Sequence, residues 1–141
     1  MENKMKLRLE CIPASVDVAG TMVATFASLN SQSEVEILDI KNAVQEAVSN
    51  CVDHAYGDFS VDNVIDVSVA LKDQGIIISV RDSGCGIQSV KRARQPLFTT
   101  RPDRNKGMGF TVMETFMDEV KVSTKCGKGT TVTLKRRMIS T

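Results

Sequence analysis

The sequence has almost no net charge and no long apolar run. Eighteen Lys and Arg residues oppose seventeen Asp and Glu residues, which leaves a formal net charge of +1. Because binding to a polyanion depends on a strongly positive field, this balance argues against direct contact with nucleic acid. No apolar run reaches the roughly 18 residues of a membrane span, and the N-terminus does not enter a signal peptide's apolar stretch. We therefore expect a cytoplasmic protein that does not bind a membrane.

Histidine and paired cysteines are also scarce. The four cysteines are far apart in the sequence and form no C-x-x-C pair, so neither a zinc knuckle nor a disulfide framework is predicted. We interpret them as small buried hydrophobes. His54 is the only histidine, which excludes a metal site built on two histidines.

Length and composition favour one globular domain over residues 1–141, since 42% of the residues are apolar and 25% are charged. Alternating apolar residues predict strands over residues 7–11, 65–71, 76–80, 120–124 and 130–134. Apolar residues at helical spacing predict helices over residues 16–27, 34–55 and 108–117. Ser15 and Ser33 are the expected N-caps of the first two helices. The expected fold is an α+β two-layer sandwich, with a mixed, mostly antiparallel sheet and its helices on one face.

One side of the long helix carries a ridge of polar residues spaced four apart, namely Asn42, Glu46, Asn50 and His54. Residues at this spacing lie one above another on a helix surface. Taken alone, such a ridge is the solvated side of an amphipathic helix.

Three glycine motifs follow along the chain. Asp82-Ser83-Gly84-Cys85-Gly86 leaves a buried strand, Gly107-Met108-Gly109 opens a helix, and Gly127-Lys128-Gly129-Thr130 lies in a hairpin. Individually these motifs are typical of an Asx turn, a helix start and a hairpin turn. A basic loop over about residues 92–106 lies between the first two, and loops of this length are often functional.

The order of the motifs is much rarer than each motif alone: E-x-x-x-N on a helix, D-x-G-x-G after a strand, G-x-G opening a helix, then G-T in a hairpin. In this order the sequence resembles the Bergerat-type ATP-binding fold of gyrase, mismatch-repair ATPases and sensor histidine kinases. Residues 93–102, 107–114 and 116–120 more closely resemble the sporulation anti-sigma factors, which are serine-protein kinases of endospore-forming bacteria. This similarity extends over essentially the whole chain.

The resemblance implies ATP and Mg²⁺ as cofactors and a role for each matching residue. Glu46 matches the catalytic base, Asn50 the magnesium ligand, and Asp82 the acceptor of the adenine amino hydrogen. The glycine motifs and the final hairpin match further nucleotide contacts, namely Gly84, Gly86, Gly107, Gly109 and Thr130. The basic loop corresponds to the family's lid, in which Thr99, Arg101 and Lys106 are candidate nucleotide contacts and Arg104 is a further candidate cation. Taken alone, the cations of this loop are equally typical of a solvated charge run.

The resemblance also implies the partners: a sporulation sigma factor, which the protein inhibits, an anti-anti-sigma protein phosphorylated on serine, and a second copy in a homodimer. Gly20 stands where we expect an arginine that relatives use to contact partners, and Ala55 where a glycine is usual.

Three alternatives remain open. The chain could be a partner-switching kinase for a stress-response sigma factor, or a module that sequesters a sigma factor without transferring phosphate. The third is the catalytic half of a histidine kinase, which is disfavoured because 141 residues contain no separate helical domain with a phospho-accepting histidine.

Overall fold

The computed structural model describes residues 2–55, 60–83, 109–125 and 129–138. In these ranges the strands are β1 (Asn3–Cys11), β2 (Ser60–Lys72), β3 (Gly75–Asp82), β4 (Glu119–Lys125) and β5 (Gly129–Arg137). The helices are α1 (Ala14–Ala27), α2 (Glu34–Asn50), the π-helical turn η1 (Cys51–Ala55) and α4 (Gly109–Phe116).

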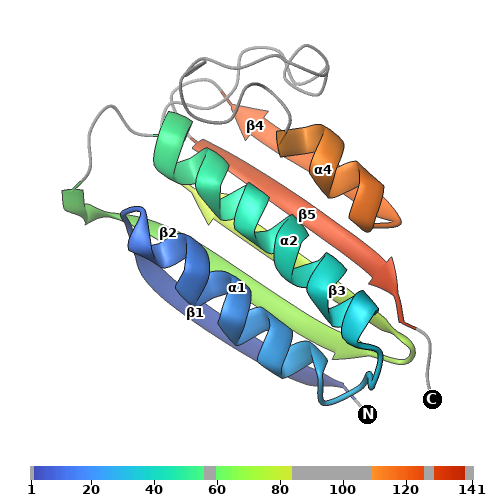
Figure 1. The fold of residues 1–141 in the computed structure, drawn as a ribbon. Helices are drawn as coiled ribbons and strands as arrows, with labels where there is room; N and C mark the ends of the chain where they lie inside the picture. Colours follow the sequence, from blue (N-terminus) through green and yellow to red (C-terminus); the bar gives the residue numbers. More distant parts are fainter. Residues whose placement is uncertain (1, 56–59, 84–108, 126–128, 139–141) are drawn as a thin grey trace.

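The strands form one five-stranded sheet in the order β1-β2-β3-β5-β4, and each pair of neighbours is antiparallel. Helices α1, α2 and α4 lie side by side on one face of this sheet, with α2 in the middle (Figure 1). The expected α+β two-layer architecture is therefore confirmed. The sheet was expected to be mixed, but no parallel pair occurs among the described strands.

The core lies between the sheet and the helix layer. Alternate strand residues face the helices, so a row such as Val67, Val80 and Val132 runs across β2, β3 and β5 in register and is buried. From the helices, residues such as Ile40 and Val44 of α2 fill the other half of the core. None of the described helices has the length and apolar character that crossing a membrane requires.

Helix α1 begins differently from the prediction. Its N-cap is Pro13, and Ser15 lies inside the first turn, buried. The Ser15 hydroxyl donates to the carbonyl oxygen of Glu10 at 2.6 Å, so it joins α1 to the end of β1 and caps no helix N–H. Proline's fixed φ suits it to this helix start.

The predicted N-cap of α2 is confirmed, because the Ser33 side chain accepts a hydrogen bond from the Glu36 N–H at 3.2 Å. Glu36 does not complete the usual reciprocal box; its carboxylate accepts from the Ser31 hydroxyl at 2.7 Å, and Ser31 in turn accepts from the Ser33 N–H.

The last turn of the expected long helix is wider than an α-helical turn. Cys51, Val52 and Asp53 are consecutive and all buried. A π-helical turn rotates less per residue, so three successive side chains can face the interior. This turn lies where α2 meets the end of β3, next to the residues considered below.

Candidate nucleotide site

Asp82 ends β3 on the face of the sheet that the helices cover. Its side chain is only 5% exposed, and its register partner on β5 is Thr130, which is also buried. The Thr130 hydroxyl lies 3.1 Å from that of Thr124, its partner on β4. The apolar rows of the core thus end in a polar row across three strands. A buried carboxylate in such a row must be held by hydrogen bonds.

Gly129 brings β5 close to the exit of β3. It has φ +97°, and a Cβ atom there would lie 2.7 Å from Ser83 Cα and closer still to the Asp82 carbonyl oxygen. A larger residue would push the two strands apart, so only glycine fits. The sequence identified this glycine as part of a hairpin turn; its contact with Asp82 was missed, because no local pattern signals it.

The end of α2 reaches Asp82. Asn50 is the last residue of α2, and the thiol of Cys51, which follows it, donates to Asp82 Oδ2 at 3.4 Å. Asn50 and Asp82 therefore lie at the same end of the molecule, as the resemblance requires. The upper-left end of the view in Figure 1 shows this meeting of α2 with the strand ends.

Glu46 lies one turn before Asn50 on α2 and is half-buried. Burial raises the pKa of its carboxyl, and the negative charge of Asp53 raises the pKa further. Asp53 is itself buried at the π-helical turn, and it was not among the predicted site residues. A carboxylate whose pKa is raised is a better proton acceptor near neutral pH.

Gly109 begins α4, which packs against α2. At the other end of α4, the Arg136 guanidinium donates both to the Phe116 carbonyl oxygen and to Asp39 near the start of α2. The two helices therefore run in opposite directions, and the start of α4 lies toward the end of α2 (Figure 1). The other predicted contacts lie outside the described residues: Gly84, Gly86, Thr99, Arg101, Arg104, Lys106 and Gly107.

The chemistry of Asn50 suits a magnesium ion bound together with a nucleotide. Among the described residues, no group of three His, Cys, Asp or Glu side chains could hold a metal by itself. Mg²⁺ commonly takes only one or two protein oxygens and completes its shell with phosphate oxygens and water. One amide oxygen at this position therefore fits the ion's requirements.

Gly20 is buried at the contact between α1 and α2. A Cβ atom there would lie 2.6 Å from Gln45 Cγ, and Gln45 donates to Asp17 at 3.3 Å. The arginine expected from the resemblance would have to displace Gln45. Helix α1 carries no Lys or Arg residue in this chain.

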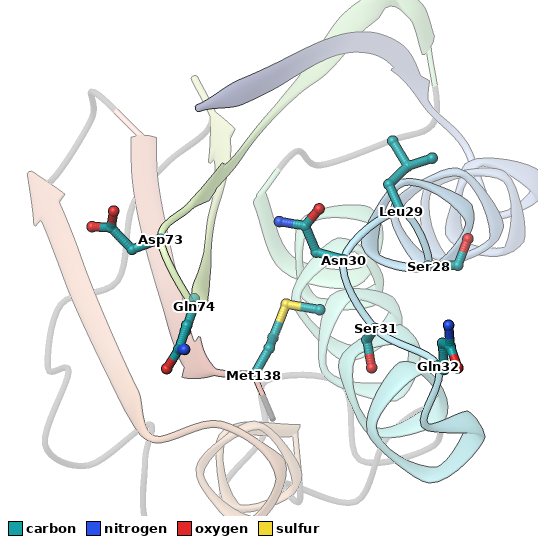
Figure 2. Close-up of a pocket in the computed structure, with 9 residues that line it drawn as sticks. Ser28, Leu29, Asn30, Ser31, Gln32, Asp73, Gln74 and Met138 are labelled. Carbon is teal, nitrogen blue, oxygen red and sulfur yellow. The ribbon is translucent and has the colours of Figure 1, made fainter. Parts of the chain in front are cut away.

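A cavity of about 310 Å³ lies at the opposite end of the sheet from Asp82. It is formed by the connection between α1 and α2, the β2–β3 turn and Met138 (Figure 2). None of the predicted site residues that the structure describes lines it.

The fold and the motif order correspond to a known class of protein. Residues 10–136 match the family model described as the histidine kinase-like ATPase domain. The chain belongs to the histidine kinase-like ATPase family.

Within that family, the similar curated proteins include anti-sigma F factors. The chain is 41% identical to that of Clostridium acetobutylicum over 138 residues, which are 97% of this chain and 95% of the relative. It is 44% identical to that of Caldanaerobacter subterraneus over 135 residues, 95% of this chain and 93% of the relative. The resemblance to sporulation anti-sigma factors is thus confirmed.

A solved structure of the RsbU and RsbW domains of a Mycobacterium tuberculosis protein has the same fold. The superposition has a TM-score of 0.69 and covers 96% of this chain and 32% of that one, at 21% sequence identity.

Proposed function

We propose that this protein is an anti-sigma factor and an ATP-dependent serine-protein kinase. In this proposal it holds a sporulation sigma factor inactive and phosphorylates a serine of a small anti-anti-sigma protein. Two findings support it: the family implies ATP binding, and relatives about 40% identical over nearly the whole chain are anti-sigma F factors. The observation that carries the site is the Cys51–Asp82 contact, which brings the Glu46–Asn50 segment to the predicted adenine acceptor.

Each of the described site residues has its own role in the proposed reaction. The buried Asp82 carboxyl accepts the amino hydrogen of adenine, and Thr130 beside it helps to fix the base. Asn50 holds Mg²⁺, which when bound neutralises charge on the phosphates. The backbone N–H groups at the start of α4, from Gly109, face the phosphates.

Glu46 is the proposed general base. It accepts the proton of the substrate serine hydroxyl while that oxygen bonds to the γ-phosphorus; the bond from the γ-phosphorus to the bridging oxygen breaks, and ADP leaves. A positioned base contributes about 10²–10⁴-fold to such a step. The raised pKa of Glu46 matches this role, because its carboxylate binds a proton more tightly than an ordinary glutamate does.

The proposal also covers the rest of the chain. Residues 1–141 form one ATPase domain, residues of about 92–106 act as its lid, and the protein works in the cytoplasm as a homodimer. β1 lies at an edge of the sheet, where a second copy could pair.

The test replaces Glu46 with Gln, which removes the base and keeps the side-chain size. With Mg-ATP and the anti-anti-sigma protein, Glu46→Gln is expected to transfer phosphate about 10²-fold more slowly or worse, while ATP affinity stays within about threefold. Transfer is followed by mass spectrometry of the substrate protein.

The same variant should capture the sigma factor as well as the wild type does, because holding the partner needs no base. Gln45→Ala, at the neighbouring position on α2, is the matched control and should retain transfer. Full activity of Glu46→Gln would remove Glu46 from this role, and an unmodified substrate with the wild type would contradict kinase activity itself.

A further inference from the structure

Two buried thiols, Cys51 and Cys11, lie near the Asp82 carboxylate. The family resemblance assigns neither of them a role. Cys51 is 4% exposed and Cys11 is fully buried. The Cys11 thiol donates to the carbonyl oxygen of Cys51 at 3.4 Å, and the Cys51 thiol donates to Asp82 Oδ2 at 3.4 Å. One thiol therefore contacts the backbone of the π-helical turn, and the other contacts the carboxylate itself.

We propose that Cys51 is a positioning residue for adenine recognition: its S–H group fixes the plane of the Asp82 carboxylate. This inference rests on the proposed ATP site. The hydrogen bond from Cys51 to Oδ2 restricts rotation of the carboxylate about its last bond before the base arrives. A preorganised acceptor binds more tightly, because less ordering remains to be done on binding.

The chemistry of the thiol supports the assignment. The Cys51 S–H group donates to Asp82 Oδ2 at 3.4 Å, and a thiol is a donor that a carboxylate oxygen can accept from. A carboxylate at position 82 accepts the amino hydrogen of adenine, whereas it repels the O6 acceptor of guanine. Cys51 thus contributes to discrimination between the two bases without touching either.

The experiment compares Cys51→Ala, Cys51→Ser and the control Cys11→Ala by calorimetric titration with Mg-ATP and with Mg-GTP. Cys11 is a suitable control because it is the same residue type, equally buried, and donates only to a backbone carbonyl. Cys51→Ala removes a hydrogen bond from a weak donor to a carboxylate, so it is expected to weaken ATP binding about five- to tenfold. It should also lower the ratio of ATP affinity to GTP affinity. Cys51→Ser should restore ATP affinity to within about twofold, and Cys11→Ala should leave it unchanged.

Comparing the ATP affinities of Cys51→Ala and Cys51→Ser distinguishes a positioning role from simple packing. If Cys51 only filled space, alanine would be tolerated better than serine, because a buried hydroxyl without a partner is unfavourable. If it positions Asp82, serine is the better replacement. ATP affinity equal in all variants, or lower in Cys51→Ser than in Cys51→Ala, would overturn the inference.

A spectroscopic readout needs no nucleotide and no activity. The infrared S–H band of Cys51, obtained as the difference between wild type and Cys51→Ala, is expected at lower frequency than that of an unbonded thiol. It should move back toward that frequency in Asp82→Asn, whose neutral amide is the weaker acceptor. An S–H band whose frequency is the same in the wild type and in Asp82→Asn would contradict the contact between Cys51 and Asp82. Wild-type protein that binds no ATP would instead remove the proposed function, whereas ATP binding that is indifferent to Cys51 would remove this inference alone.

Discussion

Glu46 carries a charge that the folded protein disfavours. Burial and Asp53 both raise its pKa, so between its unfolded and folded pKa values the native state binds more protons than the unfolded state does. Stability therefore falls as pH rises through that window, and the loss persists at neutral pH. A group held in this way is typical of a functional position, where a reactive side chain is kept at the expense of stability.

Glu46→Gln should consequently be more stable than the wild type near neutral pH, although it loses phosphate transfer. At about pH 4, where an ordinary glutamate is already half protonated, the difference should largely vanish. Urea unfolding at the two pH values measures it. Glu34→Gln is the control, and it should lower the free energy of unfolding at neutral pH. Glu34 is exposed in the first turn of α2, where a negative charge is favourable. A Glu46→Gln variant that is less stable than the wild type at neutral pH would contradict this reading.

At the scale of elements, Arg136 of β5 joins three parts of the fold. Its guanidinium lies 3.0 Å from Asp39 and 2.9 Å from the carbonyl oxygen that ends α4, and 4.0 Å from Glu36, whose side chain is 3% exposed. This contact sets how α4 lies along α2 and so where the start of α4 points. The exposed pair between Arg8 and Asp66 on the other face of the sheet has a similar length but joins only neighbouring strands.

Arg136→Ala is expected to lower the free energy of unfolding by about 2–4 kcal/mol, since it removes a cation beside the buried Glu36 and the hydrogen bonds to Asp39 and the Phe116 carbonyl oxygen. Arg8→Ala should lower the free energy of unfolding much less, because the Arg8 side chain is 73% exposed and the pair is solvated. Urea denaturation of both variants at neutral pH makes the comparison. Equal losses would show that the Arg136 contact contributes no more than a surface pair.

The elements themselves follow from local signals, which is why most of them were predictable. Alternation defined both hairpins, and Ser33 marked the start of α2 because an N-cap acts within one turn. Ser15 misled the prediction because its hydroxyl bonds to β1 and not to its own helix. The π-helical turn and the contact between Cys51 and Asp82, 31 positions apart, have no local signature. Asn50 and Asp82 could be named from motif order, but the thiol between them could not.

At the scale of the whole molecule, the two ends of the sheet and its helix layer carry different features. One end gathers Glu46, Asn50, Asp82 and Thr130, and the other holds the cavity between the α1–α2 connection and the β2–β3 turn. The central claim is that the first end binds an adenine nucleotide through Asp82. Nucleotide binding to the native state alone would stabilise the fold by about 2.7 kcal/mol at a free concentration one hundred times Kd.

Calorimetric titration of the wild type and Asp82→Asn with Mg-ATP and Mg-GTP tests this claim most directly. The account predicts one ATP site per chain, GTP binding at least about tenfold weaker, and loss of that preference in Asp82→Asn, because one charged hydrogen bond of about 1.5–3 kcal/mol is removed. Circular dichroism confirms that the variant is folded. Wild-type protein that binds ATP and GTP equally, or an Asp82→Asn variant with unchanged preference for ATP, would contradict the account.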